Sequence, residues 1–217
     1  SLRLSAAMTL KNAAAGLNRG GGKSVVYLPM GTVLTDAQKR DAMLDLGDAI
    51  ESLGGAYMTA EDVGTSAELM AVVAERTEHV CGLPADKGGV GEPADATAAG
   101  VYASLLSTLD AAFGSREVSG RHIVISGLGQ VGGRLATKLA AAGARLSVTD
   151  VNLAKKDFAA SLGAAWVDVA EAHRLEADLF VPCGLGGVLS STVIDELRVS
   201  AVVADKGSSL PLPRGKP

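Results

Sequence analysis

Two lysines and a run of glycines stand out in the stretch MTLKNAAAGLNRGGGKSVVYLP, residues 8–29. The amines of Lys11 and Lys23 suit different tasks, because a protonated amine binds a carboxylate and a neutral amine acts as a general base. Enclosure in an apolar cleft moves the pKa of a lysine from about 10.4 toward neutrality. The glycines at positions 20–22 remove side chains beside Lys23. We therefore expect Lys23 to act as a base on a small substrate that comes close to its amine.

The sequence GGGKS, residues 20–24, also looks like the end of a nucleotide-binding P-loop. That motif, G-x-x-x-x-G-K-[ST], joins a strand to the helix whose first turn binds phosphate. Its first glycine would fall at position 17, which is Leu17, and Gly16 misses by one residue. The apolar run Ser24–Pro29 that follows predicts a strand instead of a helix. Spacing and context therefore both exclude a phosphate-binding loop here.

An acidic residue, Asp62, lies in the later stretch TAEDVGT and can accept a hydrogen bond from a substrate amine. Thr9 and Asn12 stand close to Lys11, whose ammonium group suits a substrate carboxylate. These residues together indicate a site for an amino acid: Lys11 binds the carboxylate, Lys23 acts as the base and Asp62 orients the amine. The alternative is that these lysines are ordinary surface groups in solvent, where most single lysines lie.

A second glycine pattern, G-x-G-x-x-G, is formed by Gly127, Gly129 and Gly132. It directly follows the apolar run His122–Ser126 and opens a helix-forming sequence, and the next apolar run ends in Asp150. A strand, a tight glycine turn, a helix and an acid after the second strand are the features of a dinucleotide-binding unit. The alternative is a glycine turn that joins a strand to a helix and binds no ligand.

Each position in this pattern has a physical task. Gly127 permits the tight turn, Gly129 lets the backbone approach the pyrophosphate, and Gly132 lets the helix pack on the strand. The N–H groups at the start of the helix then face the phosphates. Asp150 accepts hydrogen bonds from the ribose hydroxyls and repels a 2′-phosphate, so we expect NAD rather than NADP. Two lysines soon after Asp150 can weaken that preference.

Strands that alternate with helices predict an α/β fold with a parallel sheet. Residues 1–93 are assigned to an incomplete N-terminal substrate and catalytic α/β domain, and residues 94–113 to a connecting helix. Residues 114–204 are assigned to a Rossmann-type, doubly wound NAD-binding domain that is truncated at its C-terminal end, and 205–217 to an irregular tail. The predicted strands begin near residues 24, 56, 122, 145, 164, 178 and 201, and the predicted helices near 35, 66, 94, 130 and 153.

Composition narrows the partners and the compartment. The net charge of −4 argues against nucleic acid and against an acidic membrane surface as partners, and the apolar runs are too short and broken to span a membrane. The two cysteines, Cys81 and Cys183, cannot build a disulfide framework, so we expect a reducing cytoplasm. The three histidines lack metal-ligand spacing, and we expect no metal site.

Several of these stretches together resemble one family, the Glu/Leu/Phe/Val amino-acid dehydrogenases, and most of all its leucine, valine and phenylalanine enzymes. The stretch with both lysines is similar to that family's substrate-binding signature, and TAEDVGTS to its catalytic-aspartate segment. GEPADATAAGVY resembles the start of its hinge helix, GLGQVGG its cofactor turn, and ADLFVPCGLGGV a late strand and loop near the nicotinamide. The resemblance extends from about Leu4 to Ala204.

The resemblance implies reversible oxidative deamination of a small or branched-chain L-amino acid to its 2-oxo acid and ammonium, with NAD as cofactor. Lys23 is then the base that activates water, Lys11 binds the substrate carboxylate, and Asp62 handles the substrate amine. Closure of the two domains is expected to bring Lys23 and the nicotinamide together and to exclude water. Ala60 matches a position that lines the side-chain pocket, where alanine hints at a branched aliphatic substrate.

The resemblance also assigns the contacts with the cofactor and the assembly. Thr97 is expected to contact the nicotinamide amide. The resemblance implies a homo-oligomer for the full-length protein. It also implies a chain truncated at both ends, because the family has further sequence on either side of the matched region. The alternative is a non-catalytic NAD-binding remnant or an interaction module. The full set of implied cofactor-binding residues is Thr97, Gly127, Gly129, Gln130, Val131, Gly132, Asp150, Pro182 and Cys183.

Overall fold

The computed structural model describes residues 1–204 except residues 90, 92 and 185. The predicted irregular tail, residues 205–217, lies outside the described residues. The chain divides into two compact units, with the boundary between Pro93 and Ala94. Each unit has an apolar core of its own. The substrate and cofactor roles assigned to the two parts of the chain stay predictions.

The second unit is built on a five-stranded sheet whose paired strands all run parallel. The strand order is β3-β2-β1-β4-β5, so the chain starts in the middle of the sheet, builds one edge and then crosses back to build the other. In folds of this kind, ligands bind outside the carboxyl ends of the strands where this crossover occurs, here between β1 and β4. The strands are β1 His122–Ser126, β2 Arg145–Thr149, β3 Ala165–Trp166, β4 Ala177–Pro182 and β5 Val199–Val202.

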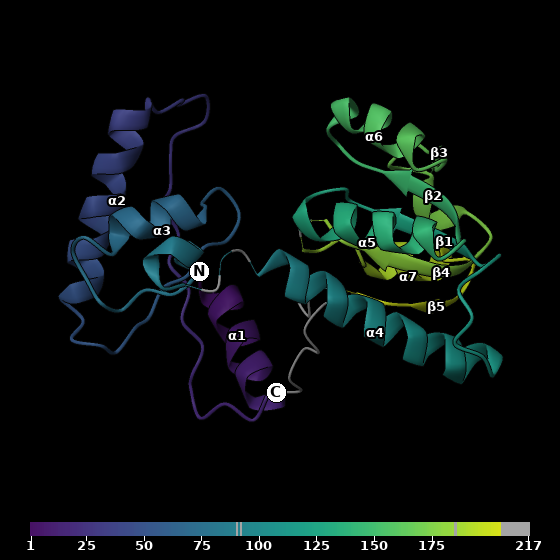
Figure 1. Ribbon diagram of the computed structural model, residues 1–217, viewed down its shortest axis with the longest axis horizontal. Coiled ribbons are helices and arrows are strands. Elements are labelled where there is room, and N and C mark those ends of the chain that lie inside the picture. Colours follow the sequence, from purple (N-terminus) through teal and green to yellow (C-terminus); the bar gives the residue numbers. More distant parts are fainter. Residues whose placement is uncertain (90, 92, 185, 205–217) are drawn as a thin grey trace. The chain divides into compact units, whose positions relative to one another are not determined.

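The central strands are apolar on both faces because helices cover both faces of the sheet. Ile123 and Ile125 of β1 pack into one core with helices α4 and α5, which lie side by side in Figure 1. Val124 points to the opposite face and packs there with Phe180 and with residues of η3 and α7. The predicted α/β class and doubly wound parallel sheet are therefore confirmed. The helical elements of this unit are α4 Ala94–Phe113, α5 Gln130–Ala141, η2 Leu153–Lys155, α6 Lys156–Ser161, η3 Ala172–Arg174 and α7 Ser191–Glu196.

The first unit is helical in its described residues, with elements α1 Leu2–Ala14, α2 Asp36–Glu51, α3 Ala67–Val73 and η1 Ala85–Lys87. Helix α2 begins with the predicted capping box, in which the Thr35 hydroxyl accepts from the Gln38 N–H and the Gln38 side chain accepts from the Thr35 N–H. Its apolar face packs on α3, and this contact forms the core of the unit. The buried members of that core are Met43, Ile50, Met70 and Val73.

Two strands predicted for the first unit are wrong. Neither Ser24–Pro29 nor residues 56–65 form a strand, and an isolated parallel bridge between Thr59 and Val80 is what the second stretch contributes. An extended segment becomes a strand when a neighbour completes its backbone hydrogen bonds. Within the described part of the chain, Ser24–Pro29 has no such neighbour.

One helix boundary differs from expectation, and two helices were not predicted. Helix α3 ends at Val73 instead of near His79, because the Thr77 hydroxyl accepts a hydrogen bond from the His79 N–H at 3.1 Å and turns the chain toward the bridge with Thr59. The sequence pattern did not indicate α1, which buries no residue, or the short α7, although Ser190 caps it. No helix in the described part of the chain is long and apolar enough to cross a membrane.

His122 opens β1 and bonds to the two segments on either side of it, β2 and the start of β4. Its backbone N–H donates to Asp178 Oδ2 at 2.8 Å, while Nδ1 lies 3.0 Å from the Glu176 carbonyl oxygen and Nε2 lies 2.8 Å from Ser147 Oγ. Burial, followed by the positive charge of Arg145, lowers the pKa of His122 below its usual value. The folded chain therefore favours the neutral ring.

This lowered pKa predicts a loss of stability in acid. Because the folded chain binds the His122 proton less well than the unfolded chain, the cost appears as the pH falls through the unfolded histidine pKa of about 6.5. We expect the urea midpoint of the second unit, followed by the fluorescence of Trp166, to fall between about pH 8 and about pH 5. The His122→Gln variant should lose less of its midpoint over this range, whereas His79→Gln should behave like the unaltered chain. Equal losses in His122→Gln and the unaltered chain would refute this account.

Candidate functional site

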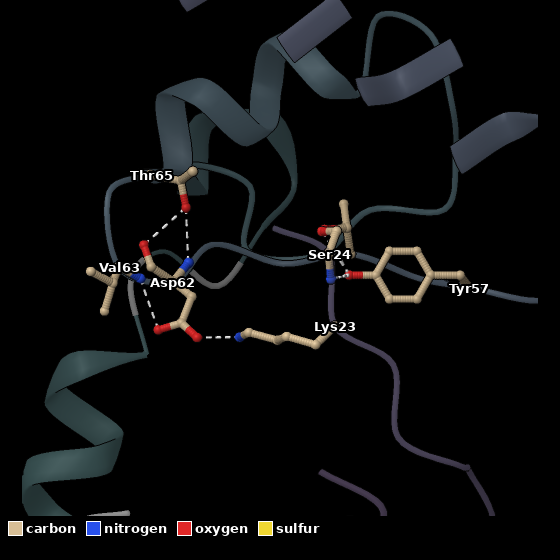
Figure 2. Close-up of polar contacts among 7 residues, drawn as sticks. Lys23, Ser24, Tyr57, Asp62, Val63 and Thr65 are labelled. Carbon is tan, nitrogen blue, oxygen red and sulfur yellow. Dashed lines mark hydrogen bonds and ion pairs between the residues drawn. The ribbon is translucent and has the colours of Figure 1, made fainter. Parts of the chain in front are cut away.

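The first unit brings two of the predicted site residues into direct contact. The Lys23 amine forms an ion pair with Asp62 Oδ2, as Figure 2 shows. The Lys23 side chain is 22% exposed and the Asp62 side chain 45%, so the pair lies at the surface of the unit with the lysine partly covered. The sequence assigned these residues separate partners, a water for Lys23 and a substrate amine for Asp62. In the structure each is the partner of the other.

A tight turn holds the Asp62 carboxylate in place. Its Oδ1 accepts a hydrogen bond from the Val63 N–H at 2.8 Å, which leaves Oδ2 directed at Lys23. The Thr65 hydroxyl accepts from the Asp62 N–H and donates to the Asp62 carbonyl oxygen, both at 2.9 Å. Figure 2 shows these contacts around the turn. Thr65 is thus a positioning residue that sequence reasoning missed, although Asp62 and Gly64 in one short stretch indicate a turn.

The glycine run before Lys23 has a different role from the predicted one. A side-chain carbon on Gly21 would lie 1.9 Å from the Ser5 carbonyl oxygen, and one on Gly22 would lie 2.5 Å from the Tyr57 ring. Only Gly20, of the three, borders open space. The glycines at positions 21 and 22 therefore allow close packing inside the unit, and the prediction that they clear room for a substrate is wrong.

Lys11 lies in the last turn of α1, where its side chain is exposed. The helix is tied to the glycine run by residues on either side of this lysine. The Gly21 N–H donates to Thr9 Oγ1 at 2.9 Å, and the Asn12 side chain donates to the Gly20 carbonyl oxygen at 2.7 Å. These bonds link the helix that bears Lys11 to the segment that bears Lys23. The binding of a carboxylate by Lys11 stays a prediction.

Ala60 lies two residues before Asp62 and is exposed, next to the buried Thr59. The pocket role of Ala60 stays a prediction.

Sequence reasoning also missed Tyr57, whose hydroxyl lies 3.1 Å from the Ser24 nitrogen. Burial alone would raise the pKa of Tyr57, but its hydrogen bonds with Ser24 and Thr59 outweigh burial and leave that pKa below its usual value.

The glycine turn of the second unit has the backbone geometry that a dinucleotide requires. Gly127 has a φ of +105°, and a side-chain carbon there would lie 2.7 Å from the Gly184 nitrogen. A side-chain carbon on Gly132 would lie 1.9 Å from the Gly127 carbonyl oxygen. A side-chain carbon added to Gly129, at the start of α5, would have no neighbour within 4 Å among the described residues. The turn therefore leaves open backbone at the helix start, and these residues fit a pyrophosphate group.

Asp150 is bound to the turn itself. Its Oδ2 accepts a hydrogen bond from the Leu128 N–H at 2.6 Å, and its Oδ1 accepts from the Asn152 N–H at 2.7 Å. A carboxylate has about four acceptor positions, so both oxygens keep capacity for ribose hydroxyls. A cavity of about 220 Å³ adjoins the turn, and its lining includes Gln130 and the cationic side chain of Lys155.

The remaining predicted cofactor residues divide into two groups. Pro182 ends β4 beside Ser126, and the Cys183 N–H donates to the Ser126 carbonyl oxygen at 2.8 Å. Cys183 is buried, and its Cβ would lie 2.9 Å from a side-chain carbon on Gly132. The structure thus gathers the residues that end β1 and β4 around the turn. Thr97, by contrast, lies half-buried in the first turn of α4.

Two further positions on the turn face different surroundings. Val131 packs against the core of the second unit. Gln130 accepts two hydrogen bonds from Arg134, one at its carbonyl oxygen and one at its side chain, and Arg134 also binds Asp95 of α4 at 2.6 Å. Among the described residues, no three His, Cys, Asp or Glu side chains gather as metal ligands would.

The chain is similar in sequence to members of one protein family. Residues 1–79 match the family model described as Glu/Leu/Phe/Val dehydrogenase, dimerisation domain. The chain is similar to leucine dehydrogenase from Geobacillus stearothermophilus, with 38% identity over 219 residues that cover 99% of this chain and 58% of that protein. It is also similar to phenylalanine dehydrogenase from Lysinibacillus sphaericus, with 37% identity over 216 residues that cover 96% of this chain and 55% of that protein.

A solved structure agrees with the sequence relatives. L-tryptophan dehydrogenase from Nostoc punctiforme matches with a TM-score of 0.71 and 28% identity, over 99% of this chain and 60% of that one. The chain therefore spans between 55% and 60% of the length of these relatives.

The close approach at the glycine turn predicts opposite outcomes for two adjacent substitutions. Gly132→Ala should destabilise the second unit by about 1–3 kcal/mol, because its new carbon meets the Gly127 carbonyl oxygen. Gly133→Ala is the matched control, since its new carbon would meet neighbours only at 3.5 Å and beyond. That variant should be neutral or more stable by up to about 1 kcal/mol, the helix-interior gain of alanine over glycine. Urea unfolding followed at Trp166 measures both, and equal stabilities would contradict the steric assignment.

Proposed function

Because this chain belongs to the Glu/Leu/Phe/Val dehydrogenase family, we propose that it carries out the reversible oxidative deamination of an L-amino acid. The products are the 2-oxo acid and ammonium. The observation that carries the proposal is the contact between the Lys23 amine and the Asp62 carboxylate, held on a preformed turn. A base and an acid side by side are what the proton transfers at the substrate amine and at the attacking water require.

The two side chains have distinct tasks in this proposal. Lys23 takes a proton from the water that attacks the Cα carbon of the imine, and Asp62 binds the substrate amine and exchanges protons with it. Asp62 suits this task because the Val63 N–H already fixes one carboxylate oxygen at 2.8 Å, so the other is aimed without further ordering. A substrate ammonium group competes with Lys23 for that oxygen. Substrate binding thereby separates the pair, and Lys23 releases its own proton to solvent before its neutral amine acts as the base on the attacking water.

The rest of the substrate is assigned to the neighbouring residues. Lys11 binds the carboxylate, in line with its exposed place on a helix tied to the glycine run. Ala60 borders the amino-acid side chain, and its small size supports a branched aliphatic substrate. The relatives named above are leucine, phenylalanine and tryptophan dehydrogenases, so the class of substrate is better supported than any single amino acid.

NAD is the proposed cofactor, and its nicotinamide supplies the acceptor for the hydride that leaves Cα. Gly127, Gly129 and Gly132, with Gln130 and Val131, shape the turn that binds the pyrophosphate. Asp150 accepts the ribose hydroxyls and disfavours a 2′-phosphate, which supports NAD over NADP. Pro182 and Cys183 border the cofactor from the end of β4, and Thr97 contacts the nicotinamide amide.

Assembly and location complete the proposal. The matched family model is described as a dimerisation domain, which supports a homo-oligomer of the whole protein. A reducing cytoplasm is the proposed location, as expected for a chain with two cysteines.

Removal of the proposed base tests the function directly. Lys23→Ala should lower kcat for deamination of leucine or valine by about 10²–10⁴-fold, the usual contribution of a general base. Its affinity for NADH, measured by fluorescence titration, should stay unchanged, because the glycine turn lies in the other unit. Lys39→Ala, which removes an exposed lysine from α2, is the control. NADH binding by the unaltered chain with no turnover on any amino acid would favour the non-catalytic remnant instead.

The carboxylate role of Lys11 has its own signature. Lys11→Ala should raise KM for the amino acid by about 10–100-fold, as expected when a hydrogen bond between charged groups is lost, with a smaller change in kcat. Initial rates at varied amino-acid concentration separate the two constants. An unchanged KM would remove Lys11 from the substrate site.

A further inference from the structure

We propose that Tyr57 is a positioning residue that fixes the backbone on both sides of Lys23 and so aims the amine at Asp62. The side chain of Tyr57 contacts the residue before Lys23 and the residue after it. The inference that catalysis depends on Tyr57 rests on the function proposed above for Lys23.

The first contact is between the phenol ring and Gly22. A side-chain carbon on Gly22 would lie 2.5 Å from Tyr57 Cδ2 and 2.6 Å from Cε2, distances that real side-chain carbons do not reach. The ring therefore presses directly on the backbone of the residue that precedes Lys23. A side chain at position 22 would therefore force the ring or the backbone to move.

The second contact is between the phenol hydroxyl and Ser24, which Figure 2 shows beside Lys23. The Ser24 N–H donates to the Tyr57 oxygen at 3.1 Å, and the Ser24 hydroxyl lies 3.0 Å from the same oxygen. The Tyr57 hydroxyl itself donates to Thr59 Oγ1 at 3.4 Å. These bonds are compatible, because a phenol has one proton to donate and accepts on its oxygen as well.

Tyr57 can serve as an anchor because its own segment is fixed. It packs against the core formed by α2 and α3. Two residues later, the Thr59 N–H donates to the His79 carbonyl oxygen at 3.0 Å and the Cys81 N–H donates to the Thr59 carbonyl oxygen at 2.8 Å. The Thr59 side chain that accepts the phenol proton is buried. Through its hydroxyl, Tyr57 thus holds the backbone next to Lys23 against a segment that is packed on the core.

The Lys23 segment needs this anchor because no strand ladder holds it in the described part of the chain. The hydrogen bonds of Gly20 and Gly21 to α1 fix the backbone before Lys23. The contact of Ser24 with Tyr57 fixes the backbone after Lys23. A lysine side chain has four rotatable bonds, so its amine reaches a defined place only when its backbone is fixed.

Tyr57 and Asp62 belong to one short segment. That segment therefore fixes the backbone of Lys23 through Tyr57 and receives its amine through Asp62. Phenylalanine at position 57 would fill the same space in the core and pack on Gly22 equally well. The hydroxyl is the part of the side chain that has a positioning role, and this separates positioning from simple core packing.

The experiment compares Tyr57→Phe with the matched control Tyr27→Phe, which removes the same hydroxyl from a side chain that is 81% exposed. Amide hydrogen exchange in the full chain should be about five- to tenfold faster at Ser24 in Tyr57→Phe, the factor expected for one net hydrogen bond. Acylation of Lys23 by an amine-reactive anhydride, measured against Lys39 by mass spectrometry, should also be faster in this variant. Tyr27→Phe should change neither quantity.

Ser24→Ala provides the second variant, since it removes the serine hydroxyl and keeps the backbone N–H bond. It should speed the acylation of Lys23 less than Tyr57→Phe does, and the double variant should be no faster than Tyr57→Phe alone. If Tyr57→Phe fails to fold, this variant decides by itself whether the contact restrains the lysine. Exchange at Ser24 and acylation of Lys23 that match the Tyr27→Phe control would overturn the proposal.

Turnover separates this inference from the proposed function. Tyr57→Phe should lower kcat for deamination with KM for NAD unchanged, which loss of overall structure would not produce. A chain whose Ser24 amide and Lys23 amine respond as expected, but which shows no deamination in any variant, would refute the enzyme function and leave the positioning contact established. Deamination that is unaltered in Tyr57→Phe, together with faster exchange at Ser24, would refute the catalytic part of the inference.

Discussion

The candidate site of the first unit depends on the ion pair between Lys23 and Asp62. A flexible amine and a carboxylate on a loop meet only if the backbone near each is fixed, and no β-ladder does this in the described residues. Close packing on glycine and single hydrogen bonds take its place: Gly21 binds α1, Ser24 binds Tyr57, and the aspartate turn closes on its own threonine. The geometry of the pair is thus the sum of a few short-range contacts.

The second unit fixes its own carboxylate by a different route. Parallel pairing places the carboxyl ends of β1, β2 and β4 at one edge of the sheet, so Asp150 and the glycine turn meet there. The Leu128 N–H then binds Asp150 at 2.6 Å and locks the turn to the neighbouring strand. In both units a backbone N–H orients an aspartate oxygen, but strand pairing orders the second site whereas the first relies on a few individual hydrogen bonds and close contacts.

Sequence reasoning succeeded where the signal is periodic or sterically strict. The bounds of α4 and β1, the capping box at Thr35 and the doubly wound sheet all followed from apolar patterns and glycine spacing. It failed in the first unit, where a strand at Ser24–Pro29 was expected from apolar residues alone, since composition does not show whether a partner strand is present. The contact of Gly22 with Tyr57 was not predicted either, because the two residues are distant in sequence. A glycine in a sequence does not indicate whether it faces a ligand or an aromatic ring.

The boundary between Pro93 and Ala94 has a consequence for inheritance. The lysine and aspartate pair lies wholly on one side of it, and the glycine turn with its own aspartate lies wholly on the other. A genetic crossover at this junction would pass each constellation to a chimera intact, with every bond described for it still inside one parent's sequence. Selection on the half that holds the lysine and aspartate pair and selection on the half that holds the glycine turn can therefore proceed on separate stretches of gene.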